Sequence, residues 1–334
     1  MRTPLPIARI LRVKALLVPV FAAALLAGLA WGSGGGGPGA LWRSIVGLPL
    51  EDSVLADIFW KIRLPRVLLA ALTGAVLSLG GLVFQALLRN PLAEPYILGI
   101  SGGSAIGAIL GILAGLPRYP WGSLAAFAGA MGTVGLLALF SSWRTGLGKD
   151  ALLLSGVMIN AFCGAVILFL ISVTSDVRLF NILSWLMGDL SLAAMEQVAL
   201  LAAVTAASAA LLFFLSHGMN LILLGRDTAL SLGVRLEALT WALLAVTSLM
   251  VGVSVSLCGL LGFVGLVMPH LMRLLFGPDH RVLVPACVLG GGAYMIFCDL
   301  LARTLPRQGE MPVGVVTALI GAPAFIFLLR RAAR

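Results

Sequence analysis

Charged residues are scarce in this chain, and acidic ones are the scarcer of the two signs. Asp, Glu, Lys and Arg make up 10% of the 334 residues, whereas hydrophobic residues make up 60%. That balance excludes an ordinary soluble fold. The 22 basic residues outnumber the 13 acidic ones, giving a formal net charge of +9. Because long stretches carry no charge at all, the excess does not form the basic patch of a nucleic-acid-binding protein, and we expect no nucleic-acid partner.

Paired cysteines are also missing. The four cysteines, Cys163, Cys258, Cys287 and Cys298, stand singly inside apolar stretches, and no CxxC spacing occurs. This excludes a disulfide framework and a cysteine-based zinc site. We expect these side chains to pack as small apolar groups, and we expect no bound metal.

What the sequence does have is long apolar runs. About 20 apolar residues cross a bilayer, so charges mark the ends of each crossing. Eight charge-free windows can each hold one helix: 15–42, 67–88, 95–117, 119–143, 151–175, 197–224, 282–298 and 311–329. A ninth window, 238–272, is too long for one crossing and is expected to turn at Cys258 and Gly259. The sequence therefore predicts an all-α polytopic membrane protein, a single transmembrane domain over 1–334 with about ten helices.

The charges between the windows predict the orientation. With ten crossings, 14 of the 22 basic and 5 of the 13 acidic residues fall on one side, and the other side carries 8 of each. The positive-inside rule then places both termini in the cytoplasm. The apolar segment 179–188 is too short to cross, so we expect a short periplasmic or re-entrant helix at about 177–192. A cleaved signal peptide at 15–31 is disfavoured because the apolar run is longer than usual.

Glycines recur every fourth residue in the third window, at Gly99, Gly103, Gly107, Gly111 and Gly115. Small residues at this spacing allow close helix packing, and a seam that slides during transport is the alternative. Residues 99–103 also match the G-x-S-x-G pattern around Ser101, which leaves an intramembrane serine hydrolase as a weak alternative. The hydrolase motif requires a preceding strand, and none is expected here.

An energy source is missing as well. The spans hold almost no ionisable residues for ion coupling, and we expect Asp299, Arg303 and Glu310 to lie as loop charges around the last outer loop. No Walker A motif occurs. Any energy must therefore come from a partner, and the longest inner segment, 216–237, is the natural contact. We expect a short helix there with Asp227 as its N-cap and Gly233 as its end, either as a docking surface or as a simple turn.

Several motifs together resemble a known family. They are Arg63-Leu64-Pro65-Arg66, Gln85, residues 90–95 (NPLAEP), Leu98-Gly99, residues 225–233, residues 262–270 (GFVGLVMPH) with Arg273, Asp279-His280-Arg281, residues 310–314 (EMPVG) and residues 321–323 (GAP). In this order they are similar to the permease subunits of iron chelate, haem and cobalamin ABC importers. The resemblance extends over about 270 residues.

The resemblance implies a homodimer in the bacterial inner membrane, with two ATPase subunits that bind ATP and Mg and a periplasmic binding protein that delivers the substrate. The permease itself would be non-catalytic and without a permanently bound cofactor. It implies ATPase coupling through Arg226, Asp227, Ala229, Leu232 and Gly233, and docking of the binding protein on Arg63, Arg66 and Arg303. It also implies a gate within 141–155 and a path along the fifth span, so the candidate residues are Ser141, Ser142, Ser155, Met158, Asn160 and Phe162.

The transported chelate is left open among haem, a ferric siderophore and cobalamin. We place haem first because Met158, Met187, Met195 and Met219 could offer soft contacts to a porphyrin, although such methionines more often serve as packing. Cobalamin comes third. The remaining alternative is a self-sufficient secondary transporter or channel.

Overall fold

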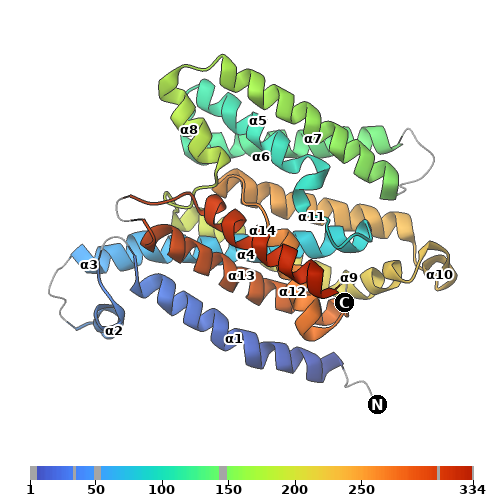
Figure 1. Ribbon diagram of the computed structural model, residues 1–334, viewed down its shortest axis with the longest axis horizontal. Coiled ribbons are helices and arrows are strands. Elements are labelled where there is room, and N and C mark those ends of the chain that lie inside the picture. The colour runs from blue at the N-terminus through green and yellow to red at the C-terminus, as the bar shows by residue number, and fades with distance from the viewer. Residues whose placement is uncertain (1–5, 33–34, 49–53, 143–148, 307–308, 333–334) are drawn as a thin grey trace.

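The computed structural model describes residues 6–32, 35–48, 54–142, 149–306 and 309–332. Over these residues the chain is helical, and connecting loops join the helices without any strand (Figure 1). The elements are α1 (Pro6–Ala30), α2 (Pro38–Val46), α3 (Val54–Asp57), η1 (Ile58–Arg63), α4 (Leu64–Leu87), η2 (Pro95–Leu98), α5 (Ile100–Leu113), η3 (Arg118–Gly122), α6 (Ser123–Ser142), α7 (Lys149–Ser172), α8 (Asp176–Leu186), α9 (Met195–Leu223), α10 (Arg226–Ser231), α11 (Leu236–Cys258), α12 (Val264–Phe276), α13 (His280–Thr304) and α14 (Val313–Ala332).

The expected all-helical membrane fold is confirmed. A helix occupies each of the ten predicted crossings, namely α1, α4, α5, α6, α7, α9, α11, α12, α13 and α14. Seven helices of the described chain are long and apolar enough to cross a membrane, and α5, α12 and the apolar part of α14 are shorter. The expected turn is also present, because α11 ends at Cys258 and Gly259 takes a φ of +74°.

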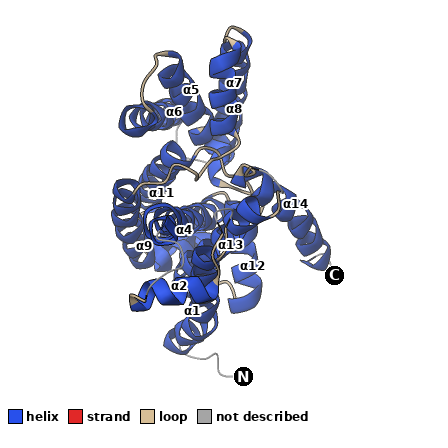
Figure 2. Cartoon of the chain, turned by 90° about the vertical axis from the view of Figure 1, so that its left-hand side faces the viewer, coloured by secondary structure: helices blue, strands red, loops and turns tan. Residues whose placement is uncertain are grey.

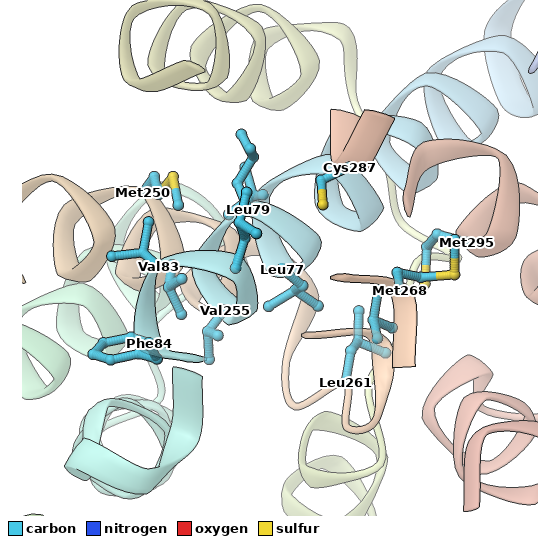
Figure 3. Close-up of a cluster of buried hydrophobic side chains, with 14 of the residues drawn as sticks. Leu77, Leu79, Val83, Phe84, Met250, Val255, Leu261, Met268, Cys287 and Met295 are labelled. Atoms are coloured by element: carbon cyan, nitrogen blue, oxygen red, sulfur yellow. The ribbon is translucent and has the colours of Figure 1, made fainter. Parts of the chain in front are cut away.

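Helix α4 lies at the centre of the molecule and is buried along nearly its whole length. It packs against α9, α11, α12 and α13, and side chains of these helices form the apolar core in Figure 3. Two crossings bring backbones into contact: a Cβ on Gly74 would lie 2.1 Å from the carbonyl oxygen of Gly291, and one on Gly81 would lie 1.7 Å from that of Gly265. Glycine is required at these points because there is no space for a side chain.

Helices α5 to α8 form a second group beside this core, joined to it through α11 (Figure 2). A Cβ on Gly103 would meet the Gly129 carbonyl oxygen at 2.4 Å, and one on Gly107 would meet that of Ala125 at 2.1 Å, so α5 and α6 touch along their backbones. The expectation of five glycines on one helix face is wrong at its two ends. Gly99 and Gly115 lie outside α5 in turns of positive φ, and only Gly103, Gly107 and Gly111 lie within the helix.

The first residues of α1, the end of α14 and the short helix α10 lie at one end of the bundle, which we call the inner end, whereas α2, α3 and α8 lie at the other, the outer end (Figure 1). The names follow the orientation predicted from charge. The short helix expected at about 177–192 corresponds to α8, which spans only Asp176–Leu186 and links α7 to the loop before α9.

Candidate functional site

The short helix α10 projects from the inner end of the bundle between α9 and α11. Its N-cap is Gly225, whose φ of +117° only glycine adopts readily, and the carbonyl oxygen of Gly225 accepts the first helical hydrogen bond from the Ala229 amide at 3.0 Å. The prediction that Asp227 is the N-cap is therefore wrong. Asp227 lies in the first turn instead, where the helix dipole favours a negative charge.

Gly233 terminates helix α10, as the sequence predicts. Gly233 has a φ of +80°, and its amide donates to the Leu230 carbonyl oxygen while the Val234 amide donates to that of Ala229. Leu230 and Leu232 are 50% and 58% exposed, and Asp227 and Thr228 are also exposed. Ala229 is fully buried beneath the helix and presents no exposed surface in this chain. The side chain of Arg226 lies outside the described part of the structure.

Polar contacts fix the helix before α10 to the start of α13. Asn220 of α9 donates from Nδ2 to Asp279 Oδ1 at 2.8 Å and accepts at Oδ1 from the His280 amide at 3.0 Å. Asp279 also caps α13 through the Arg281 amide, and Arg281 Nη2 lies 2.7 Å from Nδ1 of His217. These contacts join the end of α9 that precedes α10 to the inner end of α13.

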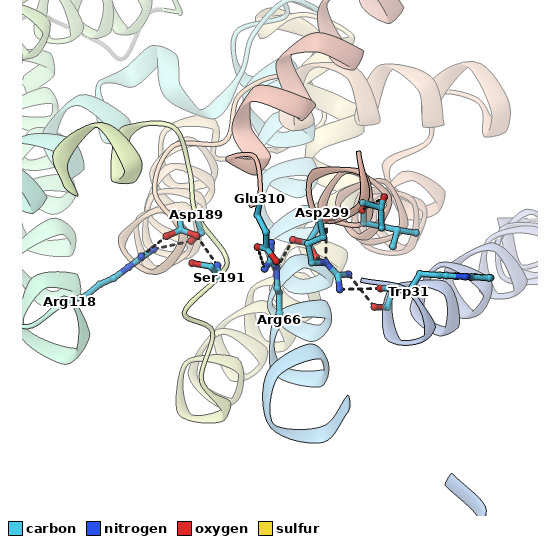
Figure 4. Close-up of polar contacts among 11 residues, drawn as sticks. Trp31, Arg66, Arg118, Asp189, Ser191, Asp299 and Glu310 are labelled. Atoms are coloured by element: carbon cyan, nitrogen blue, oxygen red, sulfur yellow. Dashed lines mark hydrogen bonds and ion pairs between the residues drawn. The ribbon is translucent and has the colours of Figure 1, made fainter. Parts of the chain in front are cut away.

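A cluster of charged residues lies inside the outer end of the bundle (Figure 4). Arg66 donates from Nε to Asp299 Oδ1 at 2.8 Å and from Nη1 to Glu310 Oε2 at 2.5 Å. Arg303 Nε lies 3.0 Å from Asp299 Oδ2 without the alignment of a hydrogen bond. Asp299 has no exposed surface, and Arg66 and Arg303 are only 5% and 3% exposed. We call these four residues the outer ion cluster.

Two arginines also donate hydrogen bonds to the last carbonyl oxygens of α1. Arg303 donates to the carbonyl oxygens of Gly28 and Trp31, and Arg63 donates to those of Leu29 and Ala30, at 3.1 to 3.3 Å. The guanidinium of Arg63 also lies 5.2 Å from the centroid of the Phe59 ring. The last carbonyls of a helix have no helical partner and carry a partial negative charge, so cations are favoured there.

These contacts correct the prediction of loop charges around the last outer loop. Asp299 and Arg303 lie on α13 inside a buried network and are not loop charges. Glu310 does remain partly exposed. Arg63, Arg66 and Arg303 do not present their charges on the outer surface, because all three are buried and already bind groups of the same chain. Sequence reasoning missed the network because Arg66 and Asp299 are 233 residues apart.

The predicted path residues on α7 do not share one face. Met158 and Phe162, one helical turn apart, are 60% and 67% exposed and line an apolar groove of about 650 Å³ with Gly103, Gly129 and Thr133. Asn160 points elsewhere, toward Gly102 at the start of α5. Ser155 is half-buried. The side chains of Ser141 and Ser142, together with residues 143–148 of the predicted gate, lie outside the described residues.

A second ion pair, which the sequence did not suggest, holds the loop between α8 and α9. Arg118 donates from Nη1 to Asp189 Oδ2 at 2.7 Å and from Nη2 to the Asp189 carbonyl oxygen at 2.9 Å (Figure 4). Burial opposes ionisation of Asp189, but hydrogen bonds from Arg118 and Ser191 outweigh it and hold the pKa of Asp189 below its usual value. Arg118 also borders a pocket of about 410 Å³ that Arg178 and Asn181 of α8 line.

Neither a hydrolase site nor a metal centre is formed by the described residues. No hydrogen bond among them joins Ser101 to a histidine; His217 and His280 belong to the contacts at the inner end, and His270 packs edge-on against Phe325. No group of three or more His, Cys, Asp or Glu in the described chain is placed to hold a metal ion.

Comparison with known proteins gives concordant matches. Residues 20–331 match the model of the FecCD transport family. The uncharacterized ABC transporter permease protein YvrB of Bacillus subtilis is 39% identical over 286 residues, which cover 84% of this chain and 81% of that protein. The vitamin B12 import system permease protein BtuC of Escherichia coli O6:H1 is 42% identical over 280 residues, covering 82% and 84%.

The fold has a solved counterpart. A structure described as an inward-facing conformation of a proposed metal-chelate type ABC transporter superposes with a TM-score of 0.85 at 31% identity, covering 96% of this chain and 99% of that one. The family match, these relatives and the helical fold agree over nearly the whole chain. The chain therefore belongs to the FecCD transport family, as a non-catalytic, multi-pass permease subunit of a bacterial inner-membrane ABC importer whose ATP is hydrolysed by a partner.

Proposed function

We propose that this permease passes a bulky metal chelate from a periplasmic binding protein to the cytoplasm, and that cobalamin stands first among the candidates. The observation that carries the choice is the 42% identity to a vitamin B12 import permease over 82% of the chain. Haem and a ferric siderophore follow. Of the four methionines that could contact a porphyrin, Met219 is fully buried, whereas Met158, Met187 and Met195 are exposed.

Transport would take place between two copies of the chain. Met158 and Phe162 line the apolar groove that α7 forms with α5 and α6, and we assign the path or the subunit contact to this surface. The inner face would receive two ATPase subunits on α10, with Asp227, Leu230 and Leu232 as the contacts. The polar contacts between α9 and α13 would carry the movement of α10 into the bundle.

The substrate is tested by reconstitution. The permease, its ATPase and a binding protein are placed in liposomes, and uptake of cobalamin, haem and a ferric siderophore is measured with the matching binding protein for each. We expect ATP-driven uptake of cobalamin above the other two. Uptake of haem or of the siderophore alone would overturn the ranking of cobalamin as the first candidate. Uptake of none of the three during ATP hydrolysis would contradict the proposal of a metal-chelate substrate.

Docking of the binding protein at the outer end is a further part of the proposal. A carboxylate of the binding protein would compete with Glu310 for Arg66, since Glu310 is the one partly exposed member of the outer ion cluster. Glu310→Gln should therefore tighten docking, measured as the affinity of the binding protein for the permease in nanodiscs. The control is Glu196→Gln, an exposed carboxylate in the first turn of α9. Equal affinity for the wild type and Glu310→Gln would remove Arg66 from the docking site.

A further inference from the structure

A second apolar groove lies at the outer end, between α1 and α2. Helix α2 is only nine residues long, starts with Pro38 and ends at Gly47 with a φ of +75°. Pro38, Leu41, Trp42 and Ile45 fall at helical spacing on one face of α2 and meet a face of α1. Because that face of α1 is built largely from alanines, the two helices leave a groove of about 270 Å³ between them. The α1 residues that line the groove are Ala23, Leu26, Ala27, Ala30 and Trp31.

Two contacts hold α2 in place beside the groove. Leu41 is 4% exposed and packs with Ala30 and Phe59 in a small separate core. Trp60 of η1 donates from Nε1 to Ser44 Oγ at 2.9 Å, about one helical turn along α2 from Leu41. These two contacts fix α2 against α1 and η1, yet Trp42, Ile45 and Val46 keep 51% to 64% of their surface exposed.

The lining of the groove favours an apolar occupant. The walls are almost entirely apolar, so water in this open groove would find few hydrogen-bonding partners there. The occupant must therefore bring apolar surface of its own.

The position of the groove identifies the occupant. Exposed aromatic side chains occur around the groove, at Trp31 on the end of α1, Trp42 on α2 and Trp60 on η1, and η3 carries two more, Tyr119 and Trp121. Tryptophan and tyrosine concentrate where hydrocarbon meets the headgroups of a bilayer. The groove is also continuous with the exposed apolar surface of α1, at Val18, Val20 and Leu26.

The groove lies at the opposite side of the molecule from the candidate path. Seen from the outer end, α1 and α2 lie at the opposite edge of the molecule from α7 and α8 (Figure 2). We propose that α2 lies in the outer interface of the membrane and that the groove between α1 and α2 holds the acyl chain of a phospholipid. An amphipathic helix in this plane buries its apolar face at the boundary between headgroups and acyl chains.

The first test measures the depth of α2. A fluorophore is attached at Ile45→Cys and, as the matched control on another face of the same helix, at Arg43→Cys; the four native cysteines are buried, so labelling is selective. In proteoliposomes, quenchers fixed to the acyl chains of phosphatidylcholine should quench the Ile45 probe more strongly than the Arg43 probe, and aqueous iodide should do the reverse. Stronger quenching of the Ile45 probe by iodide than by lipid would overturn the proposal.

The second test fills the groove. Ala27→Phe places a ring inside it, and Ala22→Phe places the same ring on the exposed surface of the same helix. Native mass spectrometry of the complex in mild detergent should show loss of a retained phospholipid in Ala27→Phe only. Equal retention in both variants would contradict the site. Loss of subunit association or of binding-protein docking in Ala27→Phe, with lipid unchanged, would assign the groove to a protein partner instead.

Discussion

At the scale of single residues, the outer end of the molecule is held by charges that are far apart in sequence. Arg66 bridges Asp299 and Glu310, and Arg63 and Arg303 satisfy the last carbonyls of α1. Sequence motifs located the three arginines, but a motif does not report burial. The partners that bury Arg66 and Arg303 are more than 200 residues away, and Arg63 binds the Ala30 carbonyl oxygen, 33 residues away.

Removing the central carboxylate should be costly. Asp299→Ala leaves Arg66 and Arg303 buried without their shared counter-charge, which typically costs about 3–5 kcal/mol. We expect a large drop in the unfolding temperature in detergent. The control is Asp57→Ala, which breaks an exposed ion pair with Lys61 that we expect to contribute little. Similar unfolding temperatures for the two variants would show that the cluster does not stabilise the outer end.

The Arg118–Asp189 pair should make stability depend on pH. The pKa of Asp189 is lowered in the folded protein, so its ionised form stabilises the fold above the ordinary value of 3.8, and this contribution is lost as the pH falls through the lower folded pKa. Asp189→Asn should therefore unfold at a lower temperature than the wild type at pH 7. The difference should shrink below about pH 3.8. A difference in unfolding temperature that stays constant between pH 7 and pH 3 would contradict this assignment.

At the scale of helices, glycine determines how closely the elements approach. The prediction of ten helices rested on charges at their ends, and it succeeded because a buried charge is costly in a membrane. Helix pairing could not be predicted in the same way. Gly81 and Gly265 touch backbone to backbone although nothing in their spacing connects them, whereas the visible glycine repeat at 99–115 includes two turn residues outside α5.

A methyl group at such a crossing should separate the helices. Gly81→Ala places a Cβ 1.7 Å from the Gly265 carbonyl oxygen, so the backbones must shift, and overpacking of this kind costs about 1–3 kcal/mol or more. Gly132→Ala in α6 meets nothing within 4 Å and serves as the control. Thermal unfolding in detergent should show a lower transition for Gly81→Ala only. Equal unfolding temperatures for the two variants would mean that the α4–α12 crossing accommodates a methyl group without loss of stability.

At the scale of the whole molecule, the chain is a membrane bundle with a separate helix, α10, exposed at its inner end. The sequence predicted where α10 ends, because Gly233 is a strong signal, and misplaced its start because Gly225 rather than Asp227 provides the cap. The family match adds that energy comes from a partner ATPase. We therefore infer that α10 is the element through which that energy enters the permease.

The most direct test is chelate uptake into liposomes that contain the permease, its ATPase and the binding protein, with Leu232→Ser in α10 compared with the wild type. Leu275→Ser, an equally exposed leucine near the inner end of α12, is the control. We predict that uptake requires both the ATPase and ATP, and that Leu232→Ser lowers it strongly while Leu275→Ser does not. Uptake that continues at the same rate without the ATPase would contradict the account.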